Sequence, residues 1–232
     1  MSTLDTTRWI GIGLLGLPFY GALFFWSSFE GQPDPDTHLR AWSRFVTTDY
    51  YVISHLLSNI LGSIFLIFGV FALGAYLATS RAGSMGLVAM FLTMLGSTLF
   101  LPLQGVATFA VPKEGQAVLA GYKALPPIFA DTVQMLTGLA VILLGFVGNI
   151  LVGAAVWRSG TLPKWSGALW AGAHVLVSLS LIYGQTIVPA RTPFTVPLGA
   201  VVVISGGWIA LSVLSRPSGA PVVGAAAQPR VR

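Results

Sequence analysis

Long apolar stretches without charged residues dominate the 232-residue chain, and the charged residues stand between them. Six of these stretches are 21 to 31 residues long. Each exceeds the roughly 18 residues that mark a membrane-spanning helix, because a helix rises about 1.5 Å per residue through a hydrocarbon core about 30 Å thick. The pattern predicts an all-α integral membrane protein, a bundle of six transmembrane helices over residues 9–29, 51–77, 85–111, 128–156, 165–188 and 194–214.

The connections between these helices differ in length on the two sides of the membrane. Residues 78–84 and 158–164 are tight hairpins, whereas residues 30–50 and 112–127 are long. Both long segments have apolar residues at helical spacing, which is typical of short helices lying in the membrane interface and equally compatible with loops that touch the bilayer surface. These residues are Leu39, Trp42 and Phe45 or Val46 in the first segment and Val118, Tyr122 and Leu125 in the second.

Residues 1–216 are expected to form one transmembrane domain. Residues 217–232 consist mainly of Ala, Gly, Pro and Val, a composition that predicts a disordered tail. A membrane β-barrel would need segments of about ten residues with alternating polarity, and the observed stretches are longer and continuously apolar.

Composition excludes several other classes of protein. Apolar residues make up 55% of the chain and charged residues 8%, far below the roughly 25% of a soluble domain. The net charge of +5 is spread over the connections, so we expect no nucleic-acid partner. Cysteine is absent, which excludes a disulfide framework, a thiolate nucleophile and a cysteine-based metal site.

The basic residues predict the orientation. With the N-terminus inside, seven Lys and Arg residues fall on the inner side and five on the outer, and six of the seven acidic residues fall outside. Basic residues beside spans are retained in the cytoplasm. We therefore expect a multi-pass protein of a bacterial-type cytoplasmic membrane, with both termini inside.

A weak internal repeat relates spans 2–3 to spans 4–5. Residues 75–83 and 154–160 both lead from a helix end with small and aromatic residues into a basic turn that contains glycine. Gln104 and Gln185 then lie near the outer ends of the following spans, each followed by a proline. This arrangement would be a parallel repeat of two hairpins, and chance composition explains it equally well.

Four predicted spans carry polar residues at helical spacing near their outer ends. Polar groups are costly in hydrocarbon unless they face the bundle or water. Residues four apart share a helix face, so each set forms a stripe. Together they predict a polar, ligand-binding pocket in the outer half of the bilayer, lined by His55, Asn59, Gln104, Asp131, Gln134, His174, Ser178 and Gln185.

Glycines and prolines add expectations about helix packing. Gly138 and Gly145 lie on one stripe of the fourth span, where small residues let neighbouring helices approach closely. Pro18 and Pro102 lie within spans and predict kinks, since proline lacks a backbone donor.

Three functional hypotheses are compatible with this pattern. The first is a protein that binds or transports a small molecule in the outer pocket, alone or as a homo-oligomer. The second is a membrane enzyme acting on a lipid-soluble substrate, with Asp131 and either His55 or His174 as acid and base. The third is an accessory subunit of a larger membrane complex. Hydrogen bonds between helices would account for any single polar residue, and no catalytic motif is present.

The sequence predicts no cofactor and no metal site. A b-type haem would need His55 and His174 as axial ligands from two spans. Their positions along the predicted helices differ in depth by roughly 10 to 15 Å, which argues against a shared haem.

Overall fold

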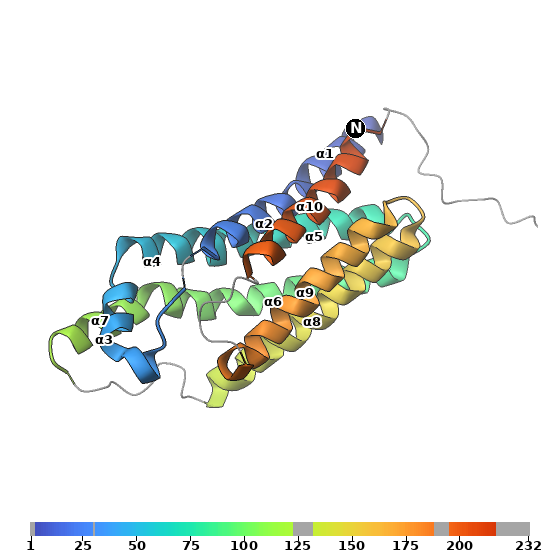
Figure 1. Ribbon diagram of the computed structural model, residues 1–232. Coiled ribbons are helices and arrows are strands. Elements are labelled where there is room, and N and C mark those ends of the chain that lie inside the picture. The colour runs from blue at the N-terminus through green and yellow to red at the C-terminus, as the bar shows by residue number, and fades with distance from the viewer. Residues whose placement is uncertain (1–2, 30, 123–131, 188–194, 217–232) are drawn as a thin grey trace, which may run out of the picture.

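The computed structural model describes residues 3–29, 31–122, 132–187 and 195–216 (Figure 1). These residues are almost all helical and contain no strand. In chain order the elements are α1 (Thr3–Leu14), α2 (Gly16–Ser27), α3 (Pro35–Val46), α4 (Asp49–Ser54), the π-helix η1 (His55–Leu61), α5 (Gly62–Leu77), α6 (Gly83–Phe109), α7 (Val111–Leu119), α8 (Thr132–Ser159), α9 (Lys164–Ile187) and α10 (Thr195–Leu214).

Helices occupy most of each range that was predicted to span the membrane. Within the described chain, five are long and apolar enough to do so: Thr6–Ser27, Asp49–Leu77, Gly83–Leu119, Thr132–Ser159 and Val196–Leu214. The remaining predicted range, 165–188, is covered by α9, a helix of 24 residues. The predicted tail, residues 217–232, lies outside the described residues.

The long helices form a closed ring in which each packs against the next along the chain. α5 packs against α6, α6 against α8, α8 against α9 and α9 against α10, while α10 returns to α1 and α2 (Figure 1). Neighbours run antiparallel. For example, a Cβ atom on Gly148 of α8 would touch Thr93 of α6, and one on Gly96 of α6 would lie 3.0 Å from the backbone nitrogen of Gly145.

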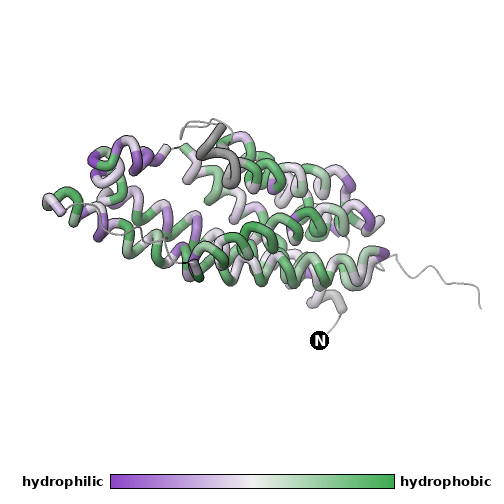
Figure 2. The backbone as a smooth tube through the Cα atoms, turned by 90° about the horizontal axis from the view of Figure 1, so that it is seen from below, coloured by the Kyte–Doolittle hydropathy of each residue, from purple (hydrophilic) through white to green (hydrophobic). Residues whose placement is uncertain are grey.

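The two ends of the ring differ. The turns at residues 78–82 and 160–163 lie together, because a Cβ on Gly160 would lie 3.7 Å from the Arg81 side chain. We call this the hairpin end. The short helices α3 and α7 pack on one another at the opposite end, called here the α3–α7 end (Figure 1). Hydrophilic residues concentrate towards the two ends, and hydrophobic residues cover the lengths of the helices between them (Figure 2).

The outer surface of the ring is apolar. Large hydrophobic side chains with more than half of their area exposed occur along its helices: Phe68, Phe71, Phe91, Leu136, Ile204 and Leu211. Contiguous apolar surface of this extent is rare on soluble monomers and is normal against lipid. The exposed side chains and the helix lengths are compatible with a helical membrane protein.

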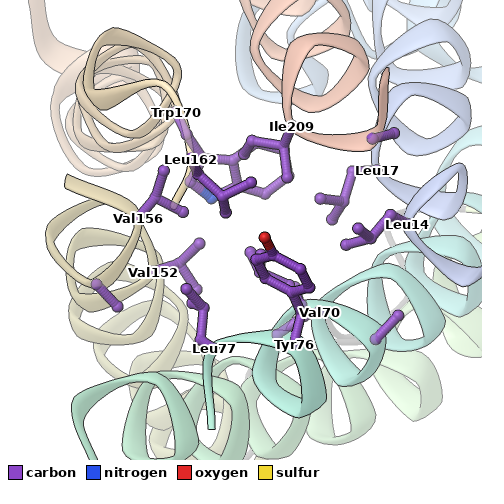
Figure 3. Close-up of a cluster of buried hydrophobic side chains, with 14 of the residues drawn as sticks. Leu14, Leu17, Val70, Tyr76, Leu77, Val152, Val156, Leu162, Trp170 and Ile209 are labelled. Atoms are coloured by element: carbon purple, nitrogen blue, oxygen red, sulfur yellow. The ribbon is translucent and has the colours of Figure 1, made fainter. Parts of the chain in front are cut away.

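The main hydrophobic core fills the ring near the hairpin end. Side chains from α1, α2, α5, α8, α9 and α10 point towards one another there (Figure 3). Trp170 is completely buried, as are Leu14 and Leu17. The core members nearest the turns are Leu77, Ala82 and Leu162. The bundle is therefore packed shut on this side.

Close backbone contacts at glycine hold the helices of the ring together. Gly153 of α8 faces Gly167 and Ala171 of α9, and a Cβ on Gly153 would collide with the Gly167 carbonyl oxygen. Gly199 of α10 faces the backbone of Phe25 of α2 in the same way. Lipid tails are as apolar as the helix surfaces, so removing these surfaces from lipid gains little free energy. Van der Waals contact between closely packed helices is therefore the main source of their association.

Of the two glycines expected to mediate helix contact, Gly145 lies where α6 approaches α8 closely, since a Cβ on Gly96 would be 3.0 Å from its backbone nitrogen, whereas Gly138 takes part in no such contact. A Cβ atom added at either position meets nothing within 4 Å. The close contacts of the fourth span extend from Gly145 through Gly148 to Gly153.

The two prolines act differently. The first span is interrupted at Leu15, three residues before Pro18, and is therefore divided into α1 and α2. Pro18 has no N–H to donate to the carbonyl of Leu14, which accounts for the interruption. α6 continues through Pro102 without interruption, so this proline does not divide its helix as Pro18 does.

The first long connection contains the short helix α3, which includes Leu39, Trp42, Phe45 and Val46, whereas α7 includes only Val118 of the second set of apolar residues. Asp34 caps α3 by accepting a hydrogen bond from the Asp36 backbone N–H, 3.0 Å. α3 and α7 share a small core with the start of the second span, formed by Trp42, Val46, Tyr51 and Val111. Tyr122 lies beyond the end of α7, and residue 125 is outside the described residues.

Replacing Gly153 by Ala is expected to destabilise the protein by about 1–3 kcal/mol, because the new methyl group must push α8 and α9 apart. Gly172→Ala is the matched control on α9: its Cβ meets nothing within 4 Å, and Ala favours a helix over Gly by up to about 1 kcal/mol. Thermal unfolding in detergent should show a lower midpoint for the first variant and an unchanged or higher one for the second. Equal midpoints would contradict the packing described here.

Candidate functional site

The inward face of α8 is packed at one end and open at the other. Val152 and Val156 on this face are buried in the core. At helical spacing the same face continues through Asn149, Gly145, Gly138 and Gln134. Because a Cβ at Gly138 or Gly145 meets nothing within 4 Å, this face has open space towards the α3–α7 end.

A cluster of three rings lies where the packed and open halves meet. The rings of Trp170 and His174, one turn apart on α9, have centroids 4.5 Å apart. The Tyr20 ring of α2 lies 6.1 Å from the His174 ring and 6.4 Å from the Trp170 ring. Tyr20 is half-buried, whereas only 6% of the surface of His174 is exposed. The cluster therefore joins two helices that are far apart in the sequence.

Asn149 holds the Trp170 ring in place. Its Oδ1 accepts a hydrogen bond from the indole N–H, 3.0 Å, and its Nδ2 donates to the Gly145 carbonyl oxygen, 2.8 Å. Both groups are buried, so breaking either bond would leave an unpaired polar atom in an apolar interior. The amide thus links α8 to α9 beside the histidine.

The hydrogen bonding of His174 leaves one ring nitrogen available. Nδ1 lies 2.9 Å from the Trp170 carbonyl oxygen. A carbonyl oxygen only accepts, so Nδ1 carries the proton. Nε2 is buried and has no hydrogen-bond partner among the described residues. An unpaired buried group of this kind costs about 1–3 kcal/mol, which water or a bound molecule would recover.

Two glutamines near the α3–α7 end also have a buried side-chain atom without a hydrogen-bond partner. Oε1 of Gln104 on α6 and Oε1 of Gln134 on α8 are buried without a hydrogen-bond partner in the described part of the chain. The antiparallel register set by Thr93 with Gly148 places Gln104 about level with Thr137, one turn from Gln134. The register of α8 with α9 places His174 about 18 Å from Gln134 along the bundle.

His55 and Asn59 lie in the π-helix η1, which packs against α2, α5 and α6. The His55 Nδ1 donates to the Tyr51 carbonyl oxygen, 2.9 Å, and the two rings have centroids 4.0 Å apart. The Tyr51 hydroxyl donates to the Ala107 carbonyl oxygen, 3.1 Å, which places His55 about level with Gln104. Asn59 accepts a hydrogen bond from the Ser58 hydroxyl, 3.3 Å.

The predicted site residues lie at successive depths along the bundle. Moving from the α3–α7 end towards the core, the order is Gln134, then His55 and Gln104, then Asn59 and Ser178, then His174. Asp131 lies outside the described residues, and so does the side chain of Gln185. The acid–base pair that an enzyme would need is consequently not placed.

Sequence reasoning missed Trp170, Tyr20 and the π-helix. Trp170 is one turn from His174 on the same face and could have been included by its spacing, whereas nothing in the sequence connects Tyr20 to α9. Within the described residues no group of three or more His, Asp or Glu side chains could hold a metal ion. His55 and His174 lie on different levels, about 12 Å apart along the bundle.

Compared with known protein families, with curated proteins and with solved structures, the chain matches none of them.

Proposed function

We propose that this membrane protein binds a small molecule inside the ring, in the half that faces the α3–α7 end. The observation that carries the proposal is the set of buried polar atoms without partners on three inward helix faces: Gln104 Oε1, Gln134 Oε1 and His174 Nε2. Native proteins pair most such atoms with protein groups or ordered water. Tyr76 Oη, Thr93 Oγ1 and Thr161 Oγ1 are also buried without a partner among the described residues, but they lie at mid-bundle or near the hairpin end. The two glutamine amides lie beside the open space at Gly105 and Gly138, which favours a region that holds water or ligand there.

The packing supports entry from one direction. The core closes the ring at the hairpin end, whereas open space adjoins Gly105 on α6 and Gly138 on α8. A molecule entering from the α3–α7 end would pass the glutamines and stop at the ring cluster of Tyr20, Trp170 and His174. Because α10 closes the ring against α1 and α2, one chain supplies this whole region.

The proposal includes a topology with six spans. We take α9 as the sixth, since it packs between α8 and α10 like the other members of the ring. The hairpin end is assigned to the cytoplasm, because it carries Arg81, Arg158, Lys164 and Arg216, whereas the acidic residues in the described connections lie at the other end. The parallel repeat of two hairpins remains a proposal within this topology.

Thiol labelling tests whether the proposed region contains water. The chain has no cysteine, so all labelling comes from the one thiol that is introduced. A charged methanethiosulfonate added from the α3–α7 side should modify Gly138→Cys at least tenfold faster than Val152→Cys, because the cysteine thiolate that attacks the reagent and displaces methanesulfinate forms only in contact with water. The rate is measured by the mass increase of the purified protein.

Phe91→Cys provides the lipid-facing control for this assay, since Phe91 is 63% exposed on the apolar surface. It should remain as unreactive as Val152→Cys. Equal rates at all three positions would contradict a water-containing region within the ring.

Filling the open space should displace a bound molecule. Gly138→Trp places an indole where a Cβ meets nothing within 4 Å, and Gly172→Trp does the same on an exposed position of α9. Native mass spectrometry should detect a small non-covalent adduct on the wild type and on Gly172→Trp that is lost from Gly138→Trp. Retention by both variants would place the adduct elsewhere and contradict the proposed site.

The assigned orientation has its own test. Arg40 and Arg81 are both exposed, Arg40 on α3 and Arg81 at the hairpin end. A membrane-impermeant maleimide should label Arg40→Cys on intact cells and Arg81→Cys only after permeabilisation. The reverse pattern would invert the topology.

A further inference from the structure

The surroundings of His174 also restrict the chemistry of the molecule, an inference that rests on the function proposed above. Nδ1–H is held by the Trp170 carbonyl oxygen, so Nε2 is the nitrogen that faces a ligand. A charged imidazolium here would be buried without a carboxylate partner, because the acidic residues of the described chain lie in or beside α3, α4 and α7 or, in the case of Asp5, in the first turn of α1 at the hairpin end. The ring is neutral for this reason, and its Nε2 accepts a hydrogen bond.

The imidazole ring of His174 packs against two other aromatic rings. The rings of Trp170 and Tyr20 flank the imidazole, and Ala173 next to it is buried in the core. Of the helices that contribute to this level, α2 has no charged residue, while Arg158, Lys164 and Arg216 lie at the hairpin ends of α8, α9 and α10. A charged ligand would have no partner at this depth.

We infer that the ring cluster binds a neutral aromatic compound that carries a hydroxyl group, the chemistry of a phenol or hydroquinone. The hydroxyl donates to His174 Nε2 and supplies the missing partner. The flat ring stacks against the faces or edges of Tyr20 and Trp170, an arrangement that aromatic groups favour. The Asn149 hydrogen bond keeps the Trp170 ring in position for this contact.

A pair of probes that differ only in the donor tests the inference. 2-Naphthol has the hydroxyl, and 2-methoxynaphthalene replaces it with a methyl ether that only accepts. Binding to the full-length protein is measured by equilibrium dialysis against the same detergent micelles without protein. We expect the wild type to bind 2-naphthol about tenfold more tightly, because only the naphthol pairs with the buried acceptor.

Two substitutions assign this preference to one nitrogen. His174→Gln places an amide oxygen near the position of Nε2 and should retain the preference for 2-naphthol. His174→Asn places its amide near the position of Nδ1, where it can still donate to the Trp170 carbonyl oxygen, but its side chain is too short to replace Nε2. The Asn variant should therefore bind the two probes with equal affinity.

The outcomes separate this inference from the function on which it rests. If the wild type binds both probes equally and Gly138→Trp abolishes binding, the site exists and the inference about the donor is wrong. A naphthol preference that survives in His174→Asn also overturns the inference. If neither probe binds the wild type, the inference fails, and the mass-spectrometric assay with Gly138→Trp decides the proposed function independently.

Discussion

Hydrocarbon offers no hydrogen bonds to a protein, and this constraint governs most of the structure. Backbone groups must pair within the chain, so the segments that can cross a bilayer are helices. The same constraint applies to side chains. Asn149 satisfies it by bridging Gly145 and Trp170, and the serines of the second span satisfy it by donating to carbonyl oxygens of their own helix, as Ser58 does to Ser54.

Side chains that do not meet this constraint occur along the whole ring, and the proposed site rests on three of them, Gln104, Gln134 and His174. Near the hairpin end the interior is filled by branched aliphatic and aromatic groups, and the helices touch through glycine. Towards the α3–α7 end the same inward faces carry amides and an imidazole whose atoms lack partners in the described chain. One ring of helices thus contains a half filled by apolar side chains and a half in which we propose that polar groups contact water or ligand.

The local structure of the spans could be predicted in part. The six helix ranges follow from the spacing of charges, because a 30 Å hydrocarbon core requires a fixed length of helix. The helical spacing of Leu39 and Trp42 similarly predicted α3. The π-helix at His55–Leu61 was not predictable, because a wider helical turn produces no recognisable pattern in an apolar sequence. Ser58 and Ser63, in and beside this segment, each donate a hydrogen bond to a carbonyl oxygen one turn back in the helix.

The sequence by itself determined that the chain is helical, apolar on its surface and polar on a few helix faces, since these properties depend on residues within one turn of each other. Only the tertiary structure decided which half of the interior is filled and which polar atoms stay unpaired. It also brought Tyr20 beside His174, residues that are 154 positions apart in the sequence. These features depend on the register and spacing between helices, which arise from contacts such as that of Gly153 with Gly167 and leave no periodic signal in the sequence.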